Sequence, residues 1–281
     1  MNEPPFGSLA PTPAQAYARA LAQRLPYTYV GRKLASLLLG PAGGRARRAF
    51  DVEVFGGARA RLHPYDNICE KRVYLTPAHW DPDERALLAD AIGRPPASKN
   101  DPFIFVDVGA NVGLYALFAR SVARAHRRGF RALCVEPDPD MRARLAFNIA
   151  ASDAGDDVSV SEKAAAAAHG LLRFAPNPTS RGMSRVAADG ARAVEGAPLT
   201  DILADARIAR VDALKIDIEG GEGAVLDAFY AAAPAALRPR FVIAEISHAG
   251  DDVESALARS GYETLLRNEL NVVARLTPQT D

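Results

Sequence analysis

Two consecutive segments decide the fold of this chain: FIFVDVGANVGLYALFAR at residues 103–120 and ALCVEPDPDMRARLAFN at residues 132–148. Each begins with an apolar run typical of a buried strand, and each run ends at an acid, Asp107 or Glu136. Two glycines follow Asp107 and precede residues of helical periodicity, which indicates a strand, a tight turn and a helix. The acids are 29 residues apart, the length of one βαβ crossover, so we expect them at the carboxyl ends of neighbouring parallel strands.

The glycine spacing separates two kinds of nucleotide site. A dinucleotide fingerprint has the pattern G-x-G-x-x-G, whose glycines bring backbone amides against a pyrophosphate. Here Asp107 stands in place of the first glycine, and a carboxylate repels phosphate but attracts an ammonium group. Glu136 can accept charge-assisted hydrogen bonds from ribose hydroxyls. S-adenosylmethionine has an amino-acid end, a ribose and no phosphate, and it therefore fits both acids.

The rest of the carboxyl-terminal part predicts a mostly parallel α/β sheet. Strands are expected at 103–108, 131–135, 158–162, 213–217, 241–246, 262–267 and 270–276, and helices at 112–127, 139–150, 224–232 and 252–259. Such alternation is typical of a parallel sheet covered on both faces. Only Asn268 and Glu269 join the last two strands, which must therefore be antiparallel. An insertion from Leu171 onward is expected to form a small hairpin and a loop.

The segment GRPPASKNDP, residues 93–102, breaks regular structure and predicts a boundary between residues 1–100 and 101–281. The amino-terminal extension is expected to begin with a disordered, proline-rich stretch to about residue 12. Two short helices within 14–39, a hairpin of 50–54 with 58–62, and helices over 66–75 and 83–92 are expected to follow. This extension could cover the substrate or pair two subunits.

Five ordered motifs resemble one family. FVDVGANVGLYA, VEPDPDMRARLAFNI, LTDIL, DALKIDIEGGEGAVL and FVIAEIS resemble the FkbM-type S-adenosylmethionine-dependent methyltransferases over residues 103–276. The resemblance implies a class I methyltransferase fold, Rossmann-like, with seven strands of which one near the edge is antiparallel. It also implies methyl transfer, most often to a hydroxyl oxygen of a small molecule or sugar.

Cofactor and catalytic residues are expected at the strand ends. The turn after Asp107 is expected to hold the methionine end, Glu136 the ribose, and the end of the third strand the adenine. The predicted cofactor-binding residues are Asp107, Gly109, Ala110, Asn111, Gly113, Glu136, Pro137, Glu162, Lys163, Ala164 and Asp217. The alternative is a structural turn with an acid paired to Arg142 or Arg144, which does not explain two acids at adjacent strand ends.

Asp217, Glu245 and His248 are the predicted catalytic residues, because each ends or follows a strand. A base that takes the acceptor's proton contributes typically 10² to 10⁴-fold to the rate. Alternatively, Asp217 and Glu219 cap the helix that begins near Gly221, and Lys215 pairs with one of these acids.

A loop and part of the extension are expected to contact the acceptor. These residues are Asn177, Ser180, Arg181, Met183, Ser184, Arg185, Asp66, Asn67 and Lys71. No tight ligand motif is present, and methyl transfer to an aliphatic oxygen needs no metal, so no metal site is predicted.

Composition limits the partners. The chain has 281 residues with 34 basic and 34 acidic side chains, and this zero net charge argues against a nucleic acid or an anionic membrane as partner. Cys69 and Cys134 are too far apart in sequence for a CxxC site, and no signal peptide or run of about 18 apolar residues is seen. A reduced, cytoplasmic protein is expected, with a small-molecule hydroxyl acceptor as partner and the extension as a site of homodimer contact.

The sequence therefore predicts an S-adenosylmethionine-dependent methyltransferase that acts on a hydroxyl of a sugar or secondary metabolite. Two alternatives remain open. One is a nucleotide-dependent oxidoreductase, which Asp107 disfavours, and the other is a non-catalytic protein that uses the fold only to bind a ligand.

Overall fold

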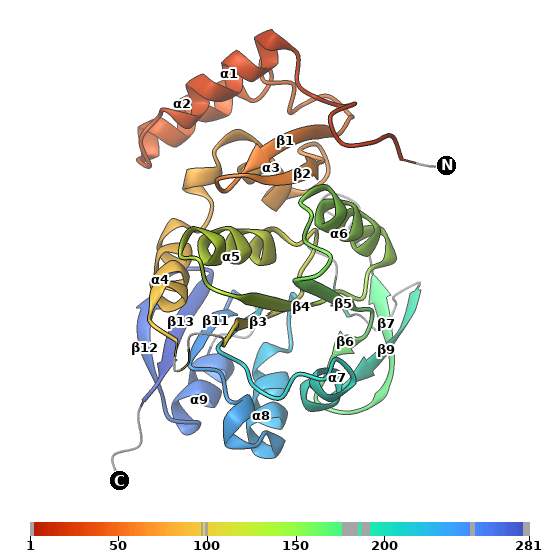
Figure 1. The fold of residues 1–281 in the computed structure, drawn as a ribbon, viewed down its shortest axis with the longest axis vertical. Coiled ribbons are helices and arrows are strands. Elements are labelled where there is room, and N and C mark those ends of the chain that lie inside the picture. Colours follow the sequence, from red (N-terminus) through yellow and green to blue (C-terminus); the bar gives the residue numbers. More distant parts are fainter. Residues whose placement is uncertain are drawn as a thin grey trace.

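A twisted seven-stranded sheet forms the centre of the protein (Figure 1). The structure is a computed structural model and describes residues 3–96, 98, 101–175, 185–186, 192–247 and 251–277. The strands of this sheet are β3 (Phe103–Val108), β4 (Phe130–Val135), β5 (Val158–Ser161), β10 (Ala213–Ile216), β11 (Phe241–Glu245), β12 (Tyr262–Arg267) and β13 (Asn271–Leu276).

The order of the strands is β12-β13-β11-β10-β3-β4-β5. All neighbours are parallel except at β13, which runs antiparallel to both β11 and β12. The chain thus starts in the middle of the sheet at β3, moves outward to β5, and returns to the other side at β10. This arrangement confirms the predicted class I methyltransferase fold, with its single reversed strand next to the edge.

Helices cover both faces of the sheet. In Figure 1, α4 (Pro82–Gly93), α5 (Leu114–Ala125) and α6 (Pro139–Ala151) lie on one face, and α7 (Leu199–Asp205), α8 (Glu222–Ala232) and α9 (Asp251–Arg259) lie on the other. Successive residues of β3 belong to different cores, because side chains alternate between the faces of a strand. Phe105 packs in the core of α4, α5 and α6, and Val106 packs in that of α7, α8 and α9.

The amino-terminal extension packs over α5 and α6 (Figure 1). It consists of α1 (Pro13–Gln23), α2 (Tyr29–Leu38), the hairpin β1 (Phe50–Val54) and β2 (Ala58–Leu62), α3 (Ile68–Leu75) and η1 (Pro77–His79). The amides of Arg59 and Arg61 on β2 donate to Ser152 and Asn148 at 2.9 and 2.8 Å, and this ties the hairpin to the end of α6. The helices and the hairpin occur where the sequence predicts them.

The expectation of a disordered start is wrong for residues 3–12. The amides of Gly7 and Leu9 donate to the buried Asp51 carboxylate at 2.8 and 3.0 Å. Asp51 also binds Arg61 at 2.7 Å, and both side chains are almost fully buried. A buried charge needs partners, so this pair holds the proline-rich segment in place. The domain boundary near residue 100 remains a prediction, although a single core cluster contains residues from both sides of it.

A second, four-stranded sheet lies beside β5 and was predicted only in part. It has the order β6-β9-β7-β8, with β6 (Ala164–Ala165), β7 (Gly170–Ala175), β8 (Arg185–Val186) and β9 (Arg192–Ala197). The expected hairpin near Leu171 corresponds to β7 and β8, whereas β6 and β9 were missed. β6 has only two residues, and β9 contains Arg192, Glu195 and Gly196 among its six, so neither shows a clear hydrophobic period. The 3-10 helix η3 (Ala235–Leu237) precedes β11.

Candidate active site

A cavity of about 220 Å³ opens at the carboxyl ends of β3, β4 and β10. It is lined by Val108, Gly109, Asn111, Val135, Glu136, Pro137, Asp138, Met141, Ala164, Ala165, Ala166, Ala167, Leu172, Asp217, Ile218, Glu219, Gly220, Gly221, Ala224 and Val225. The switch point in strand order, between β3 and β10, lies at this edge, where open α/β sheets bind ligands. We refer to this space as the cofactor cavity.

The glycine turn after β3 forms one wall of the cofactor cavity, and its glycines are required for packing. Gly109 has φ +75°, and a Cβ atom there would collide with the carbonyl oxygen of Asp217. Gly113 has φ +81°, begins α5, and leaves no room for a side chain beside Leu145. Asn111 also has a left-handed backbone, with φ +52°, and its amide points to the next strand. The turn thus brings β3 close to both β10 and α6.

Glu136 lies at the end of β4 and lines the cofactor cavity. Its carboxylate accepts hydrogen bonds from the amides of Asn111 at 2.7 Å and Asp138 at 2.9 Å. Burial raises the pKa of Glu136 to about 7, against the lowering effect of these amides. Arg142 donates to the backbone carbonyls of Glu136 and Pro137, and Arg144 pairs with Asp66 and Glu70. Within the described residues, neither arginine hydrogen-bonds the Glu136 carboxylate, so the ion-pair alternative finds no support.

Asp107 and Lys215 lie side by side on neighbouring strands, just below the cofactor cavity. Lys215 donates to Asp217 at 2.9 Å and its ammonium group lies 5.0 Å from the centre of the Tyr115 ring. This confirms the predicted pairing of Lys215 with an acid. Asp107 is 1% exposed, and neither of its carboxylate oxygens has a hydrogen-bond partner among the described residues. Burial raises the pKa of Asp107 to about 6, with Lys215 opposing that shift.

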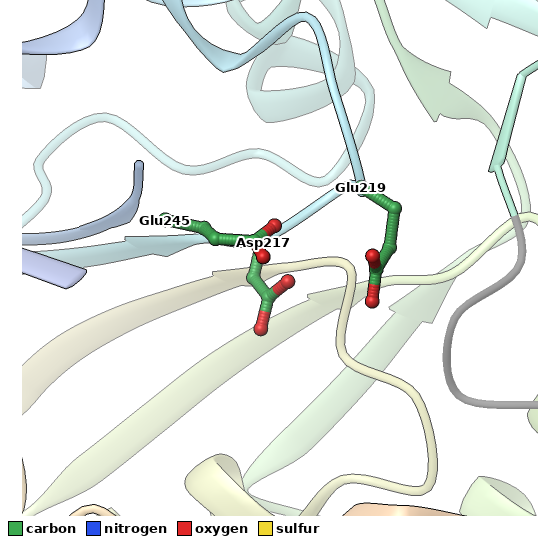
Figure 2. A group of neighbouring side chains, drawn as sticks. All are labelled: Asp217, Glu219 and Glu245. Atoms are coloured by element: carbon green, nitrogen blue, oxygen red, sulfur yellow. The ribbon is translucent and has the colours of Figure 1, made fainter. Parts of the chain in front are cut away.

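Three carboxylates meet at the other end of the cofactor cavity (Figure 2). Asp217 and Glu219 follow β10, Glu245 ends β11, and one oxygen of each lies within 4.8 Å of the others. Partial burial, followed by the negative charge of Asp217, raises the pKa of Glu245 to about 8. The hydroxyl of Ser247 also donates to Glu245. Two such close acids hold one proton between them at neutral pH.

The capping alternative for Asp217 and Glu219 is not what the structure shows. Helix α8 begins at Glu222 after Gly221, and no side chain caps it. Instead, Glu222 accepts from the amides of Ile218 and Gly220 at 2.9 and 3.1 Å and thereby holds the turn. Asp217 is left at the edge of the cofactor cavity. The oxygens of Asp217, Glu219 and Glu245 are also ligands that suit Mg²⁺. The expectation that no metal takes part therefore stays a prediction.

The structure brings only some of the predicted residues to the cofactor cavity. Gly109, Asn111, Glu136, Pro137, Ala164 and Asp217 line it, whereas Asp107, Ala110, Gly113, Glu162, Lys163 and Glu245 do not. The side chain of Glu162 is 80% exposed, and Lys163 pairs with Glu195 and Asp205. His248 and the loop residues Asn177, Ser180, Arg181, Met183 and Ser184 lie outside the described residues, and only the backbone of Arg185 is described.

Sequence reasoning missed the apolar side of the cofactor cavity. Ala165, Ala166 and Ala167 follow β5, Met141 comes from α6, and Leu172 comes from the small sheet. The alanine run at 164–168 was visible as a stretch of small residues directly after a strand. Nothing in the sequence places Leu172 there, because the small sheet itself was predicted only in part.

A second cavity, of about 660 Å³, lies between the extension and the β12–β13 turn. We refer to it as the outer cavity, and its residues are Tyr27, Arg32, Ala35, Ser36, Leu39, Lys71, Arg72, Leu75, Thr76, His79, Asp81, Pro82, Asp83, Glu84, Asn268, Glu269 and Leu270. Leu270 of this cavity precedes Asn271, which pairs with Glu245 in the register of β13 and β11, but none of the three carboxylates lines the outer cavity. Of the predicted acceptor contacts, Lys71 lines it. Asp66 pairs with Arg144, and Asn67 caps α3.

The part of the chain that forms the cofactor cavity matches a known protein family. A family model described as "Methyltransferase FkbM domain" matches residues 107–264, more than half of the chain. The chain belongs to the FkbM methyltransferase family. This confirms the resemblance seen in the five motifs. The cofactor of this family is S-adenosylmethionine, and membership in it supports an enzymatic role.

The residues at the cofactor cavity of this FkbM protein fit that cofactor. Asp107 supplies two buried carboxylate oxygens without hydrogen-bond partners among the described residues, as a ligand's ammonium group requires. Glu136 is a buried acceptor with a raised pKa, and hydrogen bonds from hydroxyls would favour its charged form. Val135, Met141 and the Ala164–Ala167 run provide the apolar surface that suits a flat heterocycle.

Solved structures similar to the FkbM chain are distant. The chain is 17% identical to the FkbM methyltransferase from Methylobacillus flagellatus, with 74% of this chain and 55% of that chain covered and a TM-score of 0.43. It is 15% identical to the METTL16 methyltransferase domain, with 93% and 91% covered and a TM-score of 0.47. It is 11% identical to an S-adenosylmethionine-dependent methyltransferase from Agrobacterium tumefaciens, with 83% and 71% covered and a TM-score of 0.44. No curated protein matches in sequence.

The chain spans 55% of the length of the Methylobacillus protein. Among the described residues, no helix is both long and apolar enough to cross a bilayer.

Proposed function

We propose that the protein transfers a methyl group to a hydroxyl of a small molecule, a sugar or a secondary metabolite. The observation that carries this proposal is the position of Glu245. Its pKa is raised to about 8, and its carboxylate lies within 4.8 Å of those of Asp217 and Glu219, which line the cofactor cavity. A hydroxyl acceptor needs a base with a pKa near or above neutrality close to the methyl donor.

Each side of the cofactor cavity has a proposed role. S-adenosylmethionine, when bound, supplies a methyl group that its sulfonium already activates. The turn from Gly109 to Gly113, with Asp107 beneath it, would hold the methionine end, and Glu136 would accept from the ribose. The alanine run that begins at Ala164, after β5, would border the adenine, whereas Glu162 and Lys163 before it do not line the cavity. Alignment of two bound reactants can supply roughly 7 to 11 kcal/mol of the barrier, so positioning is the main task of these residues.

Asp217 and Glu245 would handle the acceptor's proton. Because its pKa is raised to about 8, Glu245 is protonated at neutral pH. Above that pKa it is deprotonated and can accept the proton of the acceptor's hydroxyl. Lys215 keeps Asp217 oriented through its 2.9 Å ion pair and is itself buried. His248 remains a proposed alternative base, since it follows the same strand.

The outer cavity is the proposed acceptor site. Arg32, Lys71, Arg72, Asp81 and Asp83 give it donors and acceptors of both charges, which suits a ligand with many hydroxyl groups. Its residues come largely from the extension, which fits the expectation that residues 1–100 help to select the substrate. A small molecule, and not a nucleic acid, is the proposed partner.

Calorimetry with S-adenosylmethionine and S-adenosylhomocysteine tests the proposal first. Glu136→Ala should weaken both affinities strongly, whereas the matched variant Glu162→Ala should bind normally, because Glu162 points to solvent outside the cavity. A folded wild-type protein that binds neither compound would refute the cofactor assignment. A screen of hydroxylated acceptors with methyl-labelled cofactor then tests the reaction, and label found only on nitrogen would refute O-methylation.

A further inference from the structure

Positive charge is concentrated at the amino-terminal end of the chain. Residues 4–50 contain seven basic side chains and no acidic one: Arg19, Arg24, Arg32, Lys33, Arg45, Arg47 and Arg48. The other residues hold 27 basic and 34 acidic side chains, so the zero net charge is the sum of a basic segment and a longer acidic remainder. None of the seven forms an ion pair with a carboxylate in the described part of the chain. Arg19 is turned inward and donates to the carbonyls of Tyr74 and Glu53, whereas the other six basic residues are exposed and their charge is available to an external partner.

The same segment exposes apolar side chains. Eleven large hydrophobic residues are exposed among the described residues, and six of them lie between 17 and 37: Tyr17, Tyr27, Tyr29, Val30, Leu34 and Leu37. Isolated exposed apolar residues are ordinary on a protein surface, but such a concentration marks an interaction site. We refer to α1 and α2 together as the arm, which lies at the end of the molecule farthest from α8 in Figure 1.

Helix α2 presents three different sides. Gly31 and Ala35, four residues apart, face the rest of the protein and are buried. Arg32, Ser36 and Leu39 line the outer cavity. Val30, Leu34 and Leu37 share a third side through their i, i+4 and i+7 spacing, and they are 64%, 47% and 68% exposed.

Cations and aromatic rings flank this third side. The ammonium group of Lys33 lies 5.5 Å from the centre of the Tyr29 ring, and Arg32 lies 5.2 Å from that of Tyr27. Apolar residues on one side of a helix, with basic residues and tyrosines at its border, are the pattern of a helix that lies in the plane of a lipid interface.

We propose that the arm docks the protein on an anionic lipid surface, with Val30, Leu34 and Leu37 inserted among the lipids and the basic residues against their headgroups. This replaces the expectation of no membrane partner, which was drawn from the charge of the whole chain. The proposal goes beyond methyl transfer and does not depend on it.

The charge of the arm favours lipid over a second copy of the chain. A two-fold dimer through α2 would bring the same surface from both subunits together. The exposed cations Arg32 and Lys33 of α2 from each subunit would then repel each other, whereas an anionic bilayer neutralises them. Insertion of three apolar side chains is also typical of reversible interfacial binding.

Co-sedimentation with vesicles tests this proposal on the full chain. The protein should bind vesicles of equal parts phosphatidylglycerol and phosphatidylcholine, and it should not bind pure phosphatidylcholine. Rising salt should weaken binding, since each basic residue near the surface contributes about fivefold to the affinity. Equal binding to both vesicles, or to neither, would overturn the proposal.

Two matched variants distinguish binding through the arm from non-specific adsorption through any exposed leucine. Leu37→Asp, on the exposed side of α2, should lower vesicle binding at least tenfold. Leu171→Asp changes a 76% exposed leucine on β7 and should leave binding unchanged. Far-UV circular dichroism and cofactor affinity, measured for both, show that each variant is folded. If light scattering finds a dimer that Leu37→Asp dissociates, while vesicles bind neither form, the arm is a contact between copies and the proposal is wrong.

Discussion

The carboxyl edge of the sheet and the arm both carry many charges, but they place them in opposite surroundings. At the sheet edge Asp107, Glu136 and Lys215 are 1%, 6% and 5% exposed. On the arm, Arg32 and Lys33 are exposed, and no carboxylate pairs with either in the described residues. Burial shifts the pKa of a charged group and makes it chemically useful, whereas an exposed charge acts on whatever approaches from solvent. The protein thus buries the charges of the sheet edge and leaves those of α2 open to solvent.

Removal of the Glu245 carboxyl, whose pKa is raised, should have the largest effect on the rate. Glu245→Gln keeps the size of the side chain but cannot take a proton, so kcat should fall about 10² to 10⁴-fold. Calorimetric affinity for the cofactor should stay within about twofold, because Glu245 does not line the cofactor cavity. Retention of the wild-type rate would leave His248 as the candidate base.

The same group predicts a pH dependence. Because the pKa of Glu245 is raised to about 8, the pair is protonated at low pH and the rate should rise as pH increases through that value. The Glu245→Gln variant should lack this rise. A chelator added at each pH tests the expectation that no metal takes part, since a metal-independent rate should not change.

Loss of the Glu136 carboxylate, which is proposed to accept hydrogen bonds from the ribose, should have the next largest effect. Glu136→Ala removes hydrogen bonds to a charged group, each worth roughly 1.5 to 3 kcal/mol, so cofactor affinity should fall about 10- to 100-fold. Glu136 also accepts from the amides of Asn111 and Asp138, so thermal unfolding must be measured as well. A variant that is folded but has unchanged affinity would show that the carboxylate only holds the turn.

Neutralisation of the buried Asp107 should change stability in a pH-dependent way. Its folded pKa is raised to about 6 from a usual 3.8, so its charged form costs stability that builds up as pH rises through this interval. Asp107→Asn should therefore increase the free energy of unfolding by about 1 to 3 kcal/mol at pH 8 and change it little below about pH 4. Urea unfolding at both values measures this difference, and an equal effect at the two would contradict it.

Changes in the basic segment that follows the arm should have the smallest effect on the folded enzyme. The triple change of Arg45, Arg47 and Arg48 to Gln should alter the free energy of unfolding by less than about 0.5 kcal/mol, because exposed residues without ion pairs contribute little. Cofactor affinity should also be unchanged. A fall in either quantity would show that this basic segment and the sheet edge are coupled.

The difference between the two regions also explains what the sequence could predict. The strands β3, β4, β10 and β11 are mostly apolar, so their positions along the chain followed from the pattern to within one residue. The contact of Asp217 with Glu245 did not, because it depends on which two strands become neighbours in the sheet. A strand such as β9, which contains Arg192, Glu195 and Gly196, has no such pattern. The concentration of basic residues at 4–50 was not noticed for another reason: a net charge summed over 281 residues conceals where the charges are.

Asn111 connects the cofactor cavity with the amino-terminal extension. The amide of Asn111 donates to Glu136, and its side-chain oxygen accepts from Asn67, which caps α3, at 2.9 Å. Helix α3 carries Lys71 and Arg72 of the outer cavity. For protein engineering, acceptor choice and cofactor affinity are therefore not independent design variables. A library that varies α3 to accept new substrates should be screened for cofactor binding at the same time.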